Sequence, residues 1–270
     1  MRSFDYHCPS SLPEAAKAFA AAADTKLLAG GMTLIPAMKM RLTLPPALVD
    51  LGGVAELRGI RASKDEIGIG AMTRHADVAA SADVRRLIPA LAALAGGIGD
   101  PQVRNRGTIG GSIANNDPAA DYPAALLALG ATITTSKRKI AADKFFTGMF
   151  ETALDSGEII LQVTFPLPVM AAYEKFRSPA SRYALVGVFV AKTSSGVRVA
   201  VTGAAPCVFR ATALESLLSE KFSADALAGF RFPADGLNAD MHGDAPFRAN
   251  LISVLTRRAV ANLVAGGGKG

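Results

Sequence analysis

Of the four pairs of adjacent glycines in the first half of the chain, Gly30-Gly31 and Gly110-Gly111 most constrain what the chain can fold into. The first pair follows a short apolar segment, 26–29, which is predicted to be a strand. It precedes a predicted helix over 34–40, for which Thr33 could be the N-cap. A strand that ends in two glycines and turns into a helix exposes backbone N–H groups at the positive end of a helix dipole, which favours a bound phosphate. The same pair is also typical of an ordinary tight turn.

The second glycine pair lies within Arg104–Asn115, which reads RNRGTIGGSIAN. This segment matches neither the phosphate-binding loop of nucleotide hydrolases nor the GxGxxG motif of dinucleotide-binding folds. It nevertheless places both glycines between the hydroxyl side chains of Thr108 and Ser112. The segment is therefore either a second phosphate-sized site or a hairpin corner that needs glycine for its backbone. Two such loops in one chain favour a ligand of dinucleotide size.

An acidic segment, Asp117-Pro118-Ala119-Ala120-Asp121, follows this loop directly. Asp117 is predicted to be the N-cap of a helix that runs to Leu129 and ends at Gly130. Asp121, one turn into that helix, could accept hydrogen bonds from a polyol or ribityl chain. Alternatively, it could be solvated and interact only with the helix dipole.

The remaining predicted elements indicate an α+β chain with domain boundaries near residues 55 and 168. A capping box, Ser11-Leu12-Pro13-Glu14, predicts a helix to about Ala23, and Thr73 could cap a helix after the strand at 66–71. The other predictions are strands at 47–51, 131–135 and 158–165, a helix at 85–95, a turn-rich passage at 99–116, a hairpin of 184–193 with 197–204, helical residues 211–230, a loop at 231–248, a helix at 250–264 and a frayed tail at 266–270.

Composition narrows the chemistry that such a chain can perform. Half of the 270 residues are hydrophobic, which is enough for a sizeable core, and the net charge of +6 comes from scattered side chains. That distribution does not predict nucleic-acid binding. Cys8, Cys207 and three histidines are too few and too dispersed to hold an iron–sulfur cluster or a structural zinc ion. Cys207 is predicted to be a small core residue, and any redox chemistry would need an organic cofactor.

The chain also shows no pattern typical of membrane insertion or export. Its first residues include Asp5, and Glu14, Lys17 and Asp24 interrupt the alanine-rich stretch that follows, so no secretory signal is predicted. The charge-free run at 122–136 is shorter than the ~20 residues of a spanning helix. A cytoplasmic protein without stable membrane insertion is expected.

Together, these motifs resemble the FAD-binding (medium) subunit of molybdenum hydroxylases, the carbon monoxide dehydrogenase and xanthine dehydrogenase family. The resemblance covers essentially the whole chain. It is carried by Leu28–Pro36, Ile69–Thr73, Arg104–Asn115, the segment at 117–121, the opening Phe4–His7 and the segment Tyr183–Val188. It implies a two-subdomain FAD-binding fold of the vanillyl-alcohol-oxidase/PCMH type, with an N-terminal α/β subdomain at 1–55 and a second at 56–168. A small C-terminal α+β domain with an antiparallel sheet and helices would follow at 169–270.

The resemblance also implies which residues contact the cofactor. The first loop, Ala29–Pro36, would wrap the FAD pyrophosphate, and the second loop, through residues 108–112, would close on it from the other side. Asp121 would form hydrogen bonds to the ribityl hydroxyls. Tyr183 would stack on the isoalloxazine, although cross-strand packing is an equally open role for it. His75 lies outside both loops, so a local cap or surface contact is expected and FAD would be bound non-covalently. The implied contact residues are Ala29, Gly30, Gly31, Met32, Thr33, Leu34, Ile98, Thr108, Ile109, Gly110, Gly111, Ser112, Asp121, Leu161 (or Ile160), Lys175 and Tyr183.

The implied function is electron transfer without a catalytic residue or metal in this chain. A small subunit with [2Fe–2S] clusters would deliver electrons that a large molybdopterin subunit takes from its substrate, in a dimer of heterotrimers. The acceptor would be NAD, oxygen or a quinone. The cysteine-rich insertion of some relatives is missing here, so FAD would be the only redox centre in this chain. The alternatives are an autonomous non-covalent FAD oxidoreductase with its own substrate pocket and a structural subunit that has lost FAD.

Overall fold

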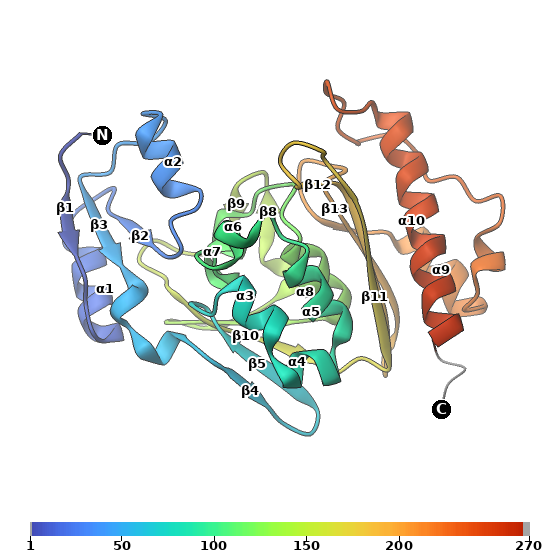
Figure 1. Ribbon diagram of the computed structural model, residues 1–270, viewed down its shortest axis with the longest axis horizontal. Helices are drawn as coiled ribbons and strands as arrows, with labels where there is room; N and C mark the ends of the chain where they lie inside the picture. Colours follow the sequence, from blue (N-terminus) through green and yellow to red (C-terminus); the bar gives the residue numbers. More distant parts are fainter. Residues whose placement is uncertain (1, 267–270) are drawn as a thin grey trace.

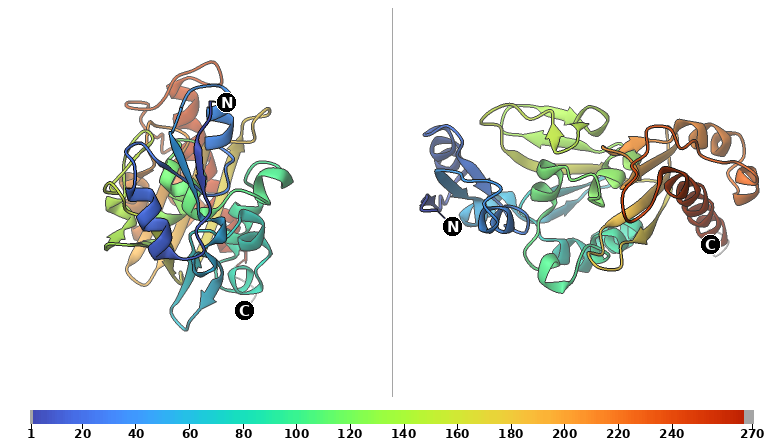
Figure 2. Two further views of the ribbon diagram at one scale, coloured as in Figure 1. Left: turned by 90° about the vertical axis from the view of Figure 1, so that its left-hand side faces the viewer. Right: turned by 90° about the horizontal axis from the view of Figure 1, so that it is seen from above.

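The computed structural model describes residues 2–266 and has an α+β architecture, as predicted. Its three larger sheets follow one another along the long axis of the molecule, with the N-terminal sheet at one end and the helix α10 at the other (Figure 1). The view from above in Figure 2 shows the same succession. Of the predicted frayed tail, residue 266 ends the helix α10, and residues 267–270 lie outside the described range. Among the described helices, none is long and apolar enough to cross a membrane.

The N-terminal sheet is built from the predicted strand–glycine–helix–strand unit. Its strands are parallel and follow the order β1-β3-β2. Val49 of β3 and Ala15 of α1 are fully buried in a small core between this sheet and its covering helix. The elements are β1 (Asp5–His7), α1 (Leu12–Ala20), β2 (Lys26–Leu28), α2 (Leu34–Lys39), β3 (Ala47–Asp50) and the short 3-10 helices η1 (Leu51–Gly53) and η2 (Ala55–Leu57).

The middle sheet is antiparallel, in the order β4-β5-β10-β6-β7, and helices lie over it (Figure 1). Every residue of α8 is buried because α8 contacts both the strand β10 and the C-terminal sheet. The elements are β4 (Ile60–Ala62), β5 (Glu66–Gly70), α3 (His75–Ala80), α4 (Ala82–Leu87), α5 (Pro89–Gly96), α6 (Pro101–Arg104), α7 (Ile109–Asn115), α8 (Tyr122–Leu129), β6 (Thr132–Thr135), β7 (Lys139–Ala141), η3 (Ala142–Lys144), the small hairpin β8 (Phe146–Gly148) with β9 (Glu151–Thr152), and β10 (Ile160–Pro166).

The C-terminal sheet is antiparallel and carries apolar side chains on both faces. Along β12, Phe189 and Ala191 join the core around α8, whereas Val188 and Val190 face the opposite way, toward α9 and α10. The sheet therefore lies between two hydrophobic cores and contributes side chains to both. The elements are β11 (Met170–Arg177), β12 (Ala184–Thr193), β13 (Gly196–Thr202), β14 (Phe209–Arg210), α9 (Thr212–Glu220), η4 (Ala224–Leu227) and α10 (Ala245–Gly266).

Three predicted helix caps lack their side-chain hydrogen bond, although α1 and α2 begin where the sequence predicts. Ser11 is the N-cap residue of α1, but its side chain makes no capping bond. The Glu14 carboxylate accepts from the backbone N–H of Ser10 at 3.0 Å, and the helix ends at Ala20 rather than near Ala23. Thr33 likewise makes no side-chain capping bond at α2. The Thr73 hydroxyl bonds to both backbone groups of Gly59 instead of capping α3, whose N-cap is Arg74.

The segments between 85 and 129 also differ from the predictions. The expected helix at 85–95 is divided by Ile88-Pro89 into α4 and α5. The supposed turn-rich passage contains two helices, α6 and α7. Asp117 is not an N-cap, since its carboxylate accepts from Ala119 N at 2.8 Å in a local turn, and α8 starts after Asp121. Near the C-terminus, α10 begins at Ala245 rather than at residue 250.

Candidate cofactor site

The first glycine loop presents a run of free backbone donors. Within the described chain, the N–H groups of residues 30 to 34 donate no hydrogen bond, whereas the next one, Ile35 N–H, donates to Gly31 O at 3.1 Å. Gly31 has a φ of +75°, which a residue with a Cβ adopts only with strain. The hydroxyl of Thr33, the N-cap residue of α2, is exposed and unbonded. The loop therefore carries N–H donors that are available to an anion.

The second glycine loop packs directly on the first. A Cβ on Gly30 would collide with the carbonyl oxygen of Arg106 and would lie 2.7 Å from the Cα of Gly107. A Cβ on Gly111 would lie 3.1 Å from that of Ala29. The glycines therefore allow the backbones of the two loops, which are nearly eighty residues apart in the sequence, to pack directly against each other.

The amides of the second loop, unlike those of the first, are already engaged. Thr108 is the N-cap of α7, and its hydroxyl accepts from Gly111 N at 3.1 Å. Ile109 N donates to Thr73 O at 3.1 Å, and Gly110 N donates to Ala71 O at 2.8 Å. Among the described residues, the N–H of Thr108 and the hydroxyl of Ser112 form no hydrogen bond and remain available.

Gly110 and Ile109 serve the packing of this helix on its neighbours. A Cβ on Gly110 would lie 2.6 Å from the Cβ of Ala71 and 2.7 Å from its carbonyl oxygen. Ile109 is fully buried in the core. The glycine at 110 is therefore explained by the close approach of α7 to the segment after β5.

Asp121 lies at the centre of a polar cluster that joins the middle part of the chain to the C-terminal sheet. Its Oδ1 accepts from the Tyr173 hydroxyl at 2.5 Å and lies 2.8 Å from Lys175 Nζ, while its Oδ2 lies 3.0 Å from the same ammonium. The residue is 4% exposed, so the solvated alternative for Asp121 is wrong. Burial raises the pKa of Asp121, and the Lys175 ammonium and Tyr173 hydroxyl oppose that shift.

The other predicted contact residues connect this cluster to the two loops. Lys175 Nζ also reaches Gly97 O at 3.4 Å, next to Ile98, and the Ile98 carbonyl accepts from Arg104 Nη1 at 2.9 Å. Arg104 begins the second loop. Leu161 packs against the same small core as Ala29 of the first loop. The structure therefore links Lys175 and Ile98 to the start of the second loop, and Leu161 to the first loop.

Tyr183 and Met32 lie at the surface of this assembly. Tyr183 is 46% exposed and lies in the turn before β12, where Ala184 N donates to Ala119 O at 3.4 Å. Its predicted alternative role as a cross-strand packing residue is therefore wrong. Met32, in the first loop, is also exposed. Both side chains are accessible to a ligand seated on the loops.

His75 contradicts the expectation of a surface contact or a cap. It is 4% exposed, and its N–H donates to Gly107 O at 3.0 Å, so it adjoins the second loop. Burial and the nearby Arg104 charge lower the pKa of His75 to about 4. Cys207, as predicted, packs against the main core.

Tyr173 is the residue that the sequence reasoning missed. The strand β11 was not predicted at all, yet its period of two places Tyr173 and Lys175 on the same face, opposite Asp121. Met170–Arg177 reads MAAYEKFR, without a regular alternation of apolar and charged residues, so no local pattern in the sequence indicated this strand.

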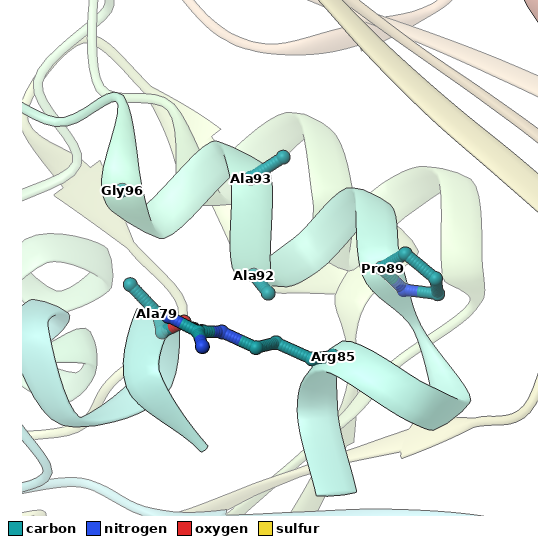
Figure 3. Close-up of a pocket in the computed structure, with 6 residues that line it drawn as sticks. All are labelled: Ala79, Arg85, Pro89, Ala92, Ala93 and Gly96. Carbon is teal, nitrogen blue, oxygen red and sulfur yellow. Dashed lines mark hydrogen bonds between the residues drawn. The ribbon is translucent and has the colours of Figure 1, made fainter. Parts of the chain in front are cut away.

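Neither of two cavities in the structure is lined by a predicted cofactor contact. One, of about 330 Å³, lies beside α3, α4 and α5, where Arg85 crosses a surface of small side chains (Figure 3). The other, of about 360 Å³, lies between Arg58 and Arg74. Among residues 2–266, no cluster of three or more potential metal ligands occurs. The Asp121 cluster and the glycine loops are therefore the best candidate site on geometric grounds.

Comparison with known proteins gives matches over most of the chain. Residues 2–168 match the family described as the FAD binding domain in molybdopterin dehydrogenase. The chain is 36% identical to the carbon monoxide dehydrogenase medium chain of Hydrogenophaga pseudoflava, over 95% of this chain and 96% of that one. It is 35% identical to the nicotine 6-hydroxylase medium subunit of Paenarthrobacter nicotinovorans, over 94% and 95%. Among solved structures, quinoline 2-oxidoreductase from Pseudomonas putida 86 superposes with a TM-score of 0.88 at 29% identity, covering 98% of both chains.

Proposed function

The chain belongs to the family of FAD-binding subunits of molybdenum hydroxylases, and from that premise we propose that it relays electrons from a [2Fe–2S] subunit to an external acceptor. When bound, FAD supplies the ability to accept and release electrons. NAD, oxygen and a quinone are the candidate acceptors. Iron–sulfur and molybdopterin groups would reside in a small and a large partner subunit, arranged as a dimer of heterotrimers.

The residues present fit FAD, and the donor run at residues 30–34 is the observation that carries the proposal. Five successive N–H groups without an acceptor in the described chain match the oxygens of a pyrophosphate. The close approach of Gly30 to Arg106 keeps the second loop against the first. The Ser112 hydroxyl and the Thr108 N–H would add donors from that side.

The remaining residues would position the other parts of the cofactor. Asp121 would accept hydrogen bonds from the ribityl hydroxyls, with Lys175 fixing the carboxylate. Ile98 and Leu161 would give apolar contacts. Tyr183, exposed and beside the Asp117–Asp121 segment, would cover one face of the ring system. These residues place the cofactor and control access to it, and no proton transfer is assigned to them.

Support for the partner subunits comes from what the relatives are. They are named medium chains or subunits of hydroxylases and dehydrogenases, and one solved relative is a carbon monoxide dehydrogenase that lacks the Mo-pyranopterin moiety of the molybdenum cofactor. That relative superposes on this chain with a TM-score of 0.87 over 98% of both chains.

The proposal is tested by purifying the chain with the proteins that accompany it. We expect about one FAD per chain from absorbance near 450 nm, together with iron and molybdenum in the co-purified subunits. Mixing the reduced complex separately with NAD, oxygen and a quinone then identifies the acceptor. A chain that cannot be reconstituted with FAD would contradict the proposal, and a flavin reduced by substrate without any partner would favour an autonomous oxidoreductase.

A further inference from the structure

We propose that Tyr173 is a positioning residue for the cofactor, because it holds Asp121 so that one carboxylate oxygen stays available to the ligand. This inference rests on the proposed role of Asp121 in binding the cofactor. It assigns a part of the site to the C-terminal sheet, beyond the family match, which ends at residue 168.

The two oxygens of Asp121 have different neighbours. Oδ1 accepts a hydrogen bond from the Tyr173 hydroxyl at 2.5 Å and also lies within ion-pair distance of Lys175 Nζ, at 2.8 Å. Oδ2 has Lys175 Nζ alone, at 3.0 Å. Since each carboxylate oxygen can accept about two hydrogen bonds, Oδ2 retains one free acceptor position. The hydrogen bond from Tyr173 to Oδ1 thereby fixes the orientation of the carboxylate and leaves the free acceptor position on Oδ2.

The neighbouring strand is shaped to hold the Tyr173 ring in this place. Phe189, directly opposite Tyr173 in the sheet, has its ring centroid 6.0 Å away. Gly187 lies opposite Lys175, and a Cβ at this position would collide with the Tyr173 hydroxyl oxygen. A glycine inside a strand weakens the strand, so its presence here marks the space that the phenol needs.

A second tyrosine provides a matched control. Tyr122 follows Asp121 directly, its ring is fully buried, and its hydroxyl has no hydrogen-bond partner among the described residues. Replacing Tyr122 by Phe therefore removes a buried hydroxyl close to Asp121 without removing a hydrogen bond to that carboxylate.

The test measures FAD affinity of the full-length apo chain by titration, for the wild type, Tyr173→Phe and Tyr122→Phe. We expect about tenfold weaker binding for Tyr173→Phe, the size of one hydrogen bond to a charged group, and near wild-type binding for Tyr122→Phe. In an Asp121→Asn background, Tyr173→Phe should have little further effect. An equal additional loss in that background would assign Tyr173 to packing and overturn the inference.

The pH dependence of FAD binding gives a readout that packing alone does not change. The charged groups acting on Asp121 are Lys175 and Arg177, and Tyr173, Tyr122 and Tyr183 are the titratable hydroxyls near it. Because the Tyr173 hydrogen bond favours the carboxylate, Tyr173→Phe should lose affinity at a higher pH than the wild type does on acidification.

The outcomes separate the two hypotheses. If the wild type binds FAD and Tyr173→Phe shows the same affinity and pH profile, the role of Tyr173 is wrong and the proposed function stands. If the wild-type chain fails to bind FAD at all, the proposed function fails, and the inference that depends on it fails too.

Discussion

Gly30 and Arg106 lie in direct backbone contact, although they belong to loops that the sequence separates widely. A Cβ on residue 30 would also lie 2.7 Å from the Cα of Gly107, and these neighbours are backbone atoms that cannot swing away. The wall on which a pyrophosphate would lie therefore depends on the absence of one side chain.

Replacing Gly30 by Ala should separate the two loops and weaken FAD binding at least tenfold. Overpacking of this kind costs about 1–3 kcal/mol, so the free energy of unfolding should fall as well. Titration of the apo chain with FAD measures the first effect and urea unfolding the second. The control is Gly266→Ala, because a Cβ there meets no atom of residues 2–266 within 4 Å. Unchanged FAD affinity in Gly30→Ala would contradict the shared wall.

Gly110 and Gly111, although adjacent, should respond differently to alanine. The Gly110 Cβ would lie 2.6 Å from that of Ala71, so we expect Gly110→Ala to lower the free energy of unfolding by about 1–3 kcal/mol and to lose FAD as a consequence. The Gly111 Cβ would meet the Thr108 hydroxyl at 3.0 Å, which is a milder contact. Thermal unfolding of both apo variants tests this order. Equal stability of the two variants would contradict it.

The elements that the sequence predicted correctly are those whose pattern is local. The first glycine unit and the hairpin of β12 and β13 follow from alternation and turn residues within short windows. The helix α7 was missed because it contains two glycines, which weaken a helix. It forms because Thr108 caps it and the carbonyls of Ala71 and Thr73 accept its first amides.

The missed parts of the site depend on contacts across the fold. The strand β11 carries charged residues that look solvated, and the partner of Lys175 lies on another element more than fifty residues away. No local pattern indicates that Asp121 is buried or that Tyr173 bonds to it. The burial of His75 behind Gly107 is likewise a tertiary effect.

Lys175→Met should destabilise the apo chain more than its double variant with Asp121→Asn. The side chains of Lys175 and Asp121 are 5% and 4% exposed, so removing the ammonium alone leaves a buried carboxylate without its ion pair, at a cost of about 3–5 kcal/mol. Neutralising both partners should restore most of that loss. Urea unfolding at neutral pH measures the difference, and a double variant less stable than Lys175→Met would contradict a buried ion pair.

His75 should make the chain less stable in weak acid. Its imidazole ring lies 5.4 Å from that of Tyr122, and neither its Nδ1 nor the Tyr122 hydroxyl has a hydrogen-bond partner among the described residues. The folded chain holds the pKa of His75 at about 4, compared with the ordinary value of 6.5. Below pH 6.5 the unfolded chain therefore binds a proton that the folded chain does not. The stability that depends on a neutral His75 is complete above pH 6.5 and is lost as the pH falls toward 4.

The size of this effect can be measured by replacement with an uncharged side chain of similar volume. Between pH 7 and pH 5, His75 should account for about 2 kcal/mol of lost unfolding free energy. Urea unfolding at both pH values should show a smaller drop for His75→Leu than for the wild type, while carboxylates contribute equally to both. His242→Gln is the control, because His242 lies exposed at the surface and should leave the wild-type drop in place. If His75→Leu loses as much stability on acidification as the wild type, His75 is not the buried neutral group that the structure indicates.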